Sequence, residues 1–355
     1  MLIENPWRRR GLPDETGLAA GSIETDPTAA QALYALCPAA GGTPLIAAPA
    51  LGDELGLGGL YIKDERGRMG LGSFKALGAA HAIAKRAAAT AARTGGPVET
   101  ALTGETFICA SAGNHGLSLA AAARIFGAQA VIHIAETVPD GFARRLSAKG
   151  ALVEKAGKDY EAAMALAKSS AAERGWHLLS DSTWEGYVDP ARDVMEGYLI
   201  MGDEAAAQMP RPPTHIFLQA GVGGLAAACA AAARRAWGDA PRIIVVEPDA
   251  APALLAAVEA GRFVTAPGPV SNMGRLDCKE ASHLALKYLA TEADAFMTVS
   301  DEAASAAADR LATLGLASTP SGVAGFAGLL AARGTLGLDA EAHVLLYLSE
   351  GAEDA

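Results

Sequence analysis

Thr106-Phe107-Ile108-Cys109-Ala110-Ser111-Ala112-Gly113-Asn114-His115-Gly116 is an uninterrupted apolar strand, then a turn of small residues, then the start of a helix. The same order of strand, tight turn and Ala/Leu-rich helix recurs along most of the chain. Strands that are apolar on both faces need a layer of helices on each side, as in parallel sheets. The sequence therefore predicts an α/β fold of the doubly wound kind.

The expected elements fall into two lobes. We expect strands at residues 60–62, 106–109, 130–134, 176–179, 215–218, 242–246 and 344–348, and helices at residues 74–93, 116–126, 160–173, 224–237, 250–260, 301–314 and 323–332. A Gly/Pro turn at residues 94–97 and a break before Pro190 predict a smaller α/β lobe at residues 100–188. That lobe would be inserted in a larger lobe, formed by residues 1–99 plus 189–355.

The composition is that of a globular protein without a basic or membrane-spanning region. Of the 355 residues, 51% are hydrophobic and 19% are charged, which is enough for a packed core. The net charge of −11 disfavours binding to nucleic acid or to an anionic membrane. No apolar run reaches the ~20 residues of a membrane span. No apolar segment typical of a secretory signal follows Arg8-Arg9-Arg10, so we expect a cytoplasmic protein.

The four cysteines, Cys37, Cys109, Cys229 and Cys278, lie far apart and show no C-x-x-C spacing. We therefore expect free thiols in a reducing compartment, not zinc ligands or disulfides. The acidic residues near the C-terminal end show no ligand spacing either. The sequence predicts no metal site.

Lys75 directly follows a glycine-rich turn, Gly70-Leu71-Gly72-Ser73-Phe74, at the start of a predicted helix. A solvated surface lysine is the ordinary interpretation, although the helix dipole disfavours a cation there. The flanking Phe74 and the apolar run after Lys75 leave little polar surface, and such surroundings would depress the pKa of the lysine. A lysine of that kind can form a Schiff base with an aldehyde.

The turn from Ser111 to Gly116 is a second candidate binding element. Ser111 can cap the helix that follows, and the free main-chain N–H groups of the turn can hold a carboxylate. An ordinary strand-to-helix loop with a serine cap is the alternative. Asn114 stands between glycines, where it can hydrogen-bond a ligand close to the backbone, and His115 is either structural or catalytic.

A third element, Gly221-Val222-Gly223-Gly224, lies between a predicted strand and a long helix. Glycines allow main-chain N–H groups to turn inward as an anion nest, and the helix dipole then favours a phosphate. A dinucleotide fingerprint is the alternative, with Glu247 or Asp249 as its acidic residue. The third glycine of that fingerprint is replaced by Ala226.

Together these three elements resemble those of the fold type II pyridoxal-phosphate enzymes, the tryptophan synthase β/threonine dehydratase superfamily. Gly72-Ser73-Phe74-Lys75 is similar to their Schiff-base motif, the run from Ser111 to Gly116 to their substrate and cofactor loop, and Gly221 to Gly224 to their phosphate loop. The resemblance implies two doubly wound lobes with pyridoxal 5'-phosphate in the cleft between them, and a homodimer.

Within that superfamily the chain resembles diaminopropionate ammonia-lyase most. The similar segments are residues 63–71 and 181–187 and Ser349-Glu350-Gly351. Two departures stand out. The resembled subgroup has an Asp before Gly-Asn-His, implicated in acting on the D-enantiomer, where this chain has Ala112 as the hydroxyamino-acid dehydratases do. The run from Ser318 to Gly322 lacks the acidic residue of its counterpart.

The resemblance also implies a role for each site residue. Lys75 would hold the cofactor and then act as base on Cα–H. The substrate carboxylate would lie on the main-chain donors of Ser111, Ala112, Gly113, Asn114 and His115. Asn114 would bond the ring hydroxyl, Ser349 the ring nitrogen (with Glu350 as competitor), and Gly221, Val222, Gly223 and Gly224 the phosphate.

Asp181 is the expected general acid for the β-leaving group, with a capping role on the Ser182 turn as the alternative. Trp184 and Tyr187 we interpret as packing residues.

The predicted function is an α,β-elimination that releases ammonia from a small β-amino- or β-hydroxy-substituted L-amino acid and leaves a keto acid. The alternative enzyme is a β-replacement synthase of the cysteine synthase kind, which shares the three loops but usually has Asn-Thr-Gly-Asn where this chain has Ser111 to Asn114. A nucleotide-binding dehydrogenase and an amino-acid sensing module without catalysis are the other two classes.

Overall fold

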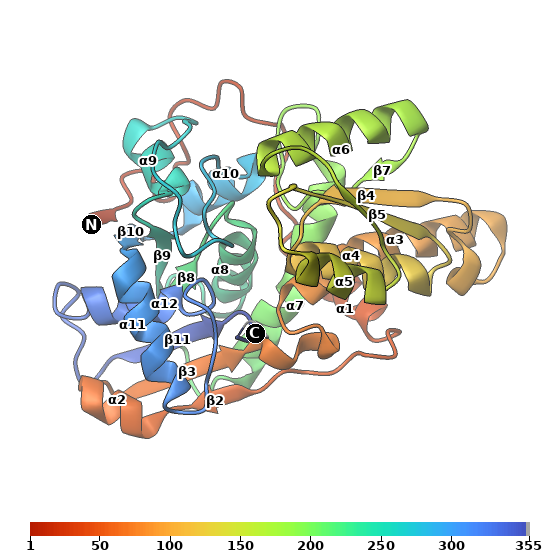
Figure 1. Cartoon of the computed structure of the whole chain (residues 1–355). Helices are drawn as coiled ribbons and strands as arrows, with labels where there is room; N and C mark the ends of the chain where they lie inside the picture. Colours follow the sequence, from red (N-terminus) through yellow and green to blue (C-terminus); the bar gives the residue numbers. More distant parts are fainter. Residues whose placement is uncertain (353–355) are drawn as a thin grey trace.

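The computed structural model describes residues 1–352 and contains two β-sheets with helices packed around them (Figure 1). The larger sheet has seven strands in the order β1 (Leu2–Glu4), β10 (Ala295–Val299), β9 (Arg242–Pro248), β8 (His215–Gln219), β11 (His343–Leu348), β3 (Gly59–Asp64) and β2 (Leu45–Ala47). Its two edge strands, β1 and β2, pair antiparallel with their neighbours, and the five strands between them are parallel.

The smaller sheet has four parallel strands, in the order β6 (Leu152–Lys155), β5 (Gln129–Ile134), β4 (Thr106–Ala110) and β7 (His177–Leu178). All of its strands lie inside residues 100–188. In Figure 1 this sheet lies on the right and the larger sheet on the left.

The helices are α1 (Thr28–Tyr34), α2 (Pro49–Leu55), α3 (Lys75–Thr94), α4 (Asn114–Ile125), α5 (Asp140–Ala148), α6 (Tyr160–Arg174), α7 (Asp189–Gln208), α8 (Gly224–Trp237), α9 (Ala253–Ala260), α10 (His283–Glu292), α11 (Asp301–Ala312) and α12 (Ala324–Ala332), with short 3-10 turns η1 (Glu65–Gly70) and η2 (Val98–Thr100). No helix within residues 1–352 is long and apolar enough to cross a membrane.

One hydrophobic core is shared by one face of each sheet, and the opposite face of each sheet has a core of its own. In β8, Ile216 and Leu218 pack in the core that contains α8, whereas Phe217 packs with α12 on the opposite face. In β4, Phe107 packs toward α4 and Ile108 toward α6. Alternate side chains of a strand point to opposite faces, so both faces of both sheets are covered by helices. The doubly wound α/β prediction is confirmed.

The seven expected strands all form, but four further strands are present. β1, β2, β6 and β10 were not predicted from the sequence. Three of them are edge strands with partly exposed side chains, so they lack the continuous apolar run that marks a central strand. α4 begins at Asn114, two residues earlier than expected, and its N-cap is Gly113; Ser111 is therefore not the cap.

A buried group of four charges fixes the segment that leads from β3 to α3. Lys63 and Arg68 each contact the Glu204 carboxylate of α7 at 2.7 Å, and Arg68 also contacts Glu65 at 2.7 Å. The side chains of Lys63, Glu65 and Arg68 are fully buried. Because the two positive and two negative charges balance, this network holds the turn before Lys75 against α7 without leaving an unpaired buried charge.

Candidate active site

Lys75 is the first residue of α3, and its ammonium forms an ion pair and hydrogen bond with the Asp181 carboxylate. Each of the two side chains is 21% exposed. The structure thus brings together the two residues that were proposed as catalytic, although they are 106 positions apart. The ammonium also lies 5.3 Å from the centre of the Phe74 ring and 5.7 Å from that of Tyr198.

The pKa of Lys75 differs from the sequence expectation. Burial alone would lower it, as expected from the apolar neighbours, but the Asp181 carboxylate outweighs burial and the pKa is raised. The expectation of a depressed pKa for the free lysine was therefore wrong, because it took no account of a paired carboxylate. For Asp181, burial acts to raise the pKa, but the charge of Lys75 lowers it below its ordinary value.

The turn that carries Asp181 is held by its neighbours in the chain. The hydroxyl of Tyr187 accepts a hydrogen bond from Ser180 N at 2.9 Å and donates to Leu178 O at 3.0 Å. The Ser182 N–H donates to the Ser180 hydroxyl at 3.3 Å, so that hydroxyl, and not Asp181, closes the turn. Tyr187, which we had assigned to packing alone, also fixes the backbone next to Asp181.

The segment from Ser111 to Gly113 leads directly into α4, and no side chain within residues 1–352 caps that helix. The first N–H groups of α4 therefore lack a side-chain partner and lie where a carboxylate could accept from them. His115 is buried, and its Nε2 is 2.8 Å from Leu179 O. This contact connects α4 to the segment before Asp181, so His115 has a structural role.

The loop from Gly221 to Gly224 has the backbone shape of an anion cradle. Gly223 is the N-cap of α8 with φ of +97°, and no side chain caps the helix. A Cβ at Gly221 would lie 3.0 Å from Leu276 Cα and 3.1 Å from Arg275 O, so the loop also needs its smallest residue there. Uncapped N–H groups at the start of a buried helix suit a phosphate. The residues present fit the phosphate end of pyridoxal phosphate.

The end of β11 is linked to the lysine loop by backbone hydrogen bonds. Phe74 N donates to Ser349 O at 3.0 Å, and Gly351 N donates to Gly72 O at 2.9 Å. Ser349 is 5% exposed and lies one residue after β11. The proposed partner of the ring nitrogen is therefore fixed to the backbone that carries Lys75.

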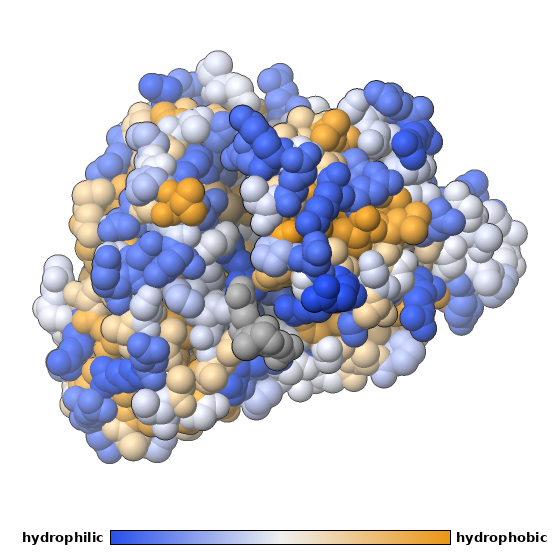
Figure 2. All heavy atoms as spheres, in the orientation of Figure 1, coloured by the Kyte–Doolittle hydropathy of each residue, from blue (hydrophilic) through white to orange (hydrophobic). Residues whose placement is uncertain are grey.

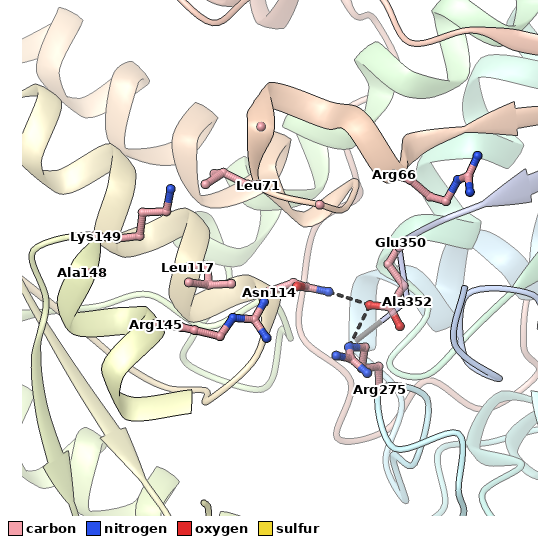
Figure 3. Close-up of a pocket in the computed structure, with 13 residues that line it drawn as sticks. Arg66, Leu71, Asn114, Leu117, Arg145, Ala148, Lys149, Arg275, Glu350 and Ala352 are labelled. Atoms are coloured by element: carbon pink, nitrogen blue, oxygen red, sulfur yellow. Dashed lines mark hydrogen bonds and ion pairs between the residues drawn. The ribbon is translucent and has the colours of Figure 1, made fainter. Parts of the chain in front are cut away.

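Glu350, the competing candidate at that position, contacts several side chains. It accepts from Asn114 Nδ2 at 2.5 Å and pairs with Arg275 Nε at 2.7 Å, as Figure 3 shows, and Thr319 also donates to it. The sequence did not predict these contacts of Arg275 and Thr319, because no motif or regular spacing connects either residue with Glu350 after β11. Asn114 is thus oriented by an acidic residue of the other sheet.

Tyr198, on α7, was also missed. It is 1% exposed, its ring packs 4.9 Å from that of Phe74, and burial raises its pKa to about 12. Within residues 1–352 its hydroxyl forms no hydrogen bond of normal geometry. A tyrosine in a helical pattern gives no sequence signal that separates it from an ordinary core residue.

One of the two acids named for the dinucleotide alternative, Glu247, is not accessible to a ligand. Glu247 is fully buried, and its two carboxylate oxygens accept from Leu254 N and Leu255 N at 2.8 Å each. Burial raises its pKa to about 8. It therefore holds the start of α9 and cannot bind a ribose. Among residues 1–352, no group of three or more His, Cys, Asp or Glu side chains is arranged to hold a metal ion.

Comparison with known proteins assigns the family. The family model described as pyridoxal-phosphate dependent enzyme matches residues 36–350, and the chain belongs to that family. It is therefore an enzyme of fold type II that uses pyridoxal 5'-phosphate.

Three relatives place the chain more closely. Diaminopropionate ammonia-lyase of Salmonella typhimurium is 32% identical over 348 residues, which cover 87% of this chain and 85% of that protein. The human L-serine dehydratase/L-threonine deaminase is 32% identical over 208 residues, 58% of this chain and 60% of that protein. The crystal structure of Escherichia coli diaminopropionate ammonia lyase in complex with an aminoacrylate-PLP azomethine reaction intermediate has a TM-score of 0.85 at 27% identity, covering 99% of this chain and 93% of that one.

Proposed function

We propose that this enzyme catalyses an α,β-elimination on a small L-amino acid with a β-amino or β-hydroxy group, giving a keto acid and ammonia. The observation that carries the proposal is the Asp181 carboxylate paired with the Lys75 ammonium. An elimination needs a base at Cα and a proton for the leaving group, and this pair can supply both when Lys75 is the neutral amine: the nitrogen takes the Cα proton and Asp181 relays it. The similarity to ammonia-lyases and dehydratases agrees with this chemistry.

The residues that would hold the cofactor are Lys75, Asn114, Ser349 and the loop Gly221, Val222, Gly223 and Gly224. When bound there, pyridoxal phosphate supplies the electron sink that acidifies Cα–H. The N–H groups of the loop from Ser111 to His115 would bind the substrate carboxylate and so fix the direction of the Cα–H bond. A neutral hydroxyl at Ser349 keeps the sink weaker than a carboxylate would, and this favours rapid loss of the β-substituent.

The proton follows a short route in this arrangement. Lys75 Nζ takes it from Cα, and Asp181 Oδ2 is in hydrogen-bond contact with that nitrogen. Asp181 then delivers the proton to the leaving nitrogen or oxygen as the Cβ bond breaks. One C–H bond and one C–N or C–O bond break, and the unsaturated amine that remains takes up water and releases ammonia.

The same proposal includes the setting in which the enzyme works. We propose a cytoplasmic homodimer, from the family resemblance and from Cys37, Cys109, Cys229 and Cys278, which are all free thiols. We also propose the division into lobes at residues 1–99 plus 189–355 and 100–188.

A panel of amino acids tests the proposal. The holoenzyme should release equal amounts of keto acid and ammonia from serine, or two ammonia for each keto acid from diaminopropionate. The β-replacement alternative is tested in the same assay by adding sulfide. Formation of a thiol amino acid at the expense of keto acid would overturn elimination as the main reaction.

A further inference from the structure

A cavity of about 480 Å³ opens between the two lobes beside Asn114 (Figure 3). Four cationic side chains line it: Arg66, Arg145, Lys149 and Arg275. Among residues 1–352, Glu350 is the one carboxylate that lines it, and apart from Asn114 the rest of the wall is small or apolar. Such a surplus of positive charge is unusual in a chain whose net charge is −11.

Two of the four cations are neutralised by carboxylates of the large lobe. Arg66 forms a two-bond ion pair with Asp64, and Arg275 pairs with Glu350 at 2.7 Å. These contacts hold the two guanidinium groups in place on one side of the cavity. The two carboxylates also balance the positive charges of Arg66 and Arg275.

Arg145 and Lys149 form the opposite side of the cavity. Arg145 lies in the last turn of α5 in the small lobe and Lys149 is the C-cap residue of that helix; within residues 1–352 neither forms an ion pair. Figure 2 shows strongly hydrophilic residues where α5 faces the large lobe. Within residues 1–352, these two positive charges beside Asn114, the residue that we place against cofactor and substrate, have no carboxylate partner.

We propose that this cavity binds an anionic group, a carboxylate or a phosphate, that the substrate carries in addition to its α-carboxylate. The inference rests on the proposed function and narrows its substrate class to amino acids with a second acidic group. Guanidinium and ammonium groups bind such oxygens with charge-assisted hydrogen bonds, which are about twice as strong as neutral ones. A separate anion bound beside the substrate would use the same chemistry, and the experiment has an arm for each.

Equilibrium binding provides the first arm and does not depend on turnover. Malonate and inorganic phosphate are titrated into the holoenzyme by calorimetry. Arg145→Gln and Lys149→Gln should each weaken binding at least about tenfold, the loss expected for one charged hydrogen bond. Arg144→Gln is the matched control, because Arg144 is the exposed neighbour on the same helix but does not line the cavity. Equal affinity in wild type and all variants would overturn the proposal.

Kinetics provide the second arm. The ratio of kcat/KM for 3-hydroxyaspartate or O-phosphoserine to that for serine should exceed one. It should fall about tenfold in Arg145→Gln and stay unchanged in Arg144→Gln. If the cavity binds anions but the enzyme shows no preference for the acidic substrates, the cavity holds a separate anion. The inference about the substrate is then overturned. No ammonia from any amino acid would instead contradict the proposed function, and the calorimetry would still decide whether the cavity binds anions.

Discussion

Asn114 and Glu350 lie 236 positions apart in the chain, yet the Asn114 side-chain nitrogen donates to the Glu350 carboxylate at 2.5 Å. The contact connects the start of α4, beside the smaller sheet, to the residues after β11 in the larger one. It uses one of the two N–H bonds of the amide, which leaves the second N–H and the carbonyl oxygen for a ligand. Glu350 thus sets the orientation of the Asn114 amide, which we propose to contact the cofactor.

Lys75→Ala should fold but lose its covalent link to pyridoxal phosphate and its turnover. The visible absorption band of the holoenzyme reports the link, and borohydride reduction followed by peptide mass analysis locates it. Lys158→Ala, which alters an 86% exposed side chain, is the control and should keep both. Wild-type turnover in Lys75→Ala would refute the whole assignment.

Asp181→Asn should slow elimination by about 10²–10⁴, the usual contribution of general acid–base catalysis. It should also change the pH dependence of cofactor loading. The Asp181 charge raises the pKa of Lys75, so the reactive neutral amine becomes commoner as pH rises. Removing that charge lowers the pKa and moves the midpoint of the loading rate to lower pH. Stopped-flow absorbance from pH 6 to 10 measures this shift, and an unchanged profile with full activity would leave Asp181 without a role.

Gly223→Ala and Gly224→Ala should differ sharply. Gly223 has φ of +97°, which costs a non-glycine residue about 1–2 kcal/mol, and relaxing this strain would turn its N–H out of the cradle. The atoms nearest to a Cβ at Gly224 would be Met195 Cγ at 3.4 Å and Tyr198 Cε2 at 3.6 Å, which are ordinary contacts. Only Gly223→Ala should therefore raise the dissociation constant of the cofactor and lower the free energy of unfolding.

Tyr198→Phe should leave the free energy of unfolding unchanged or raise it, because it removes a buried hydroxyl without a hydrogen-bond partner in residues 1–352. If that hydroxyl serves the Lys75 amine, kcat should fall and its pH profile should shift. Thermal unfolding and a pH–rate series distinguish the two effects. A variant with lower stability and an unaltered pH profile would make Tyr198 a packing residue.

The enzyme should strongly prefer L-amino acids. Ala112 offers no base, and Lys75 and Asp181 lie together, so protons can be taken from one face of Cα only. Pinning the carboxylate on the loop from Ser111 to His115 presents the hydrogen to that face in one enantiomer. Rates on D- and L-serine measure the preference, and comparable rates would point to a second base elsewhere.

The central strands other than β10 and the three loops were predictable because their signals are local. An apolar run such as 215–218 or a turn such as Gly221 to Gly224 is visible within a few residues. The neighbours of Lys75 in the sequence predict a lowered pKa for this lysine. Its pairing with Asp181, which those neighbours do not reveal, raises the pKa instead. The contact of Asn114 with Glu350 depends on how two sheets meet, and local spacing carries no information about that.

The charges of Lys63, Glu65, Arg68 and Glu204 also have a consequence for how the sequence can change over evolution. Removing one partner of a buried pair costs about 3–5 kcal/mol, whereas replacing the whole set with apolar residues of similar volume is often tolerated. The fully buried Arg68 contacts both carboxylates, so only lysine there would keep the charges balanced, and an ammonium lacks the planar fork that meets both partners. Among homologous sequences, these four positions should therefore covary, and the segment that carries Lys75 should be inherited as a block.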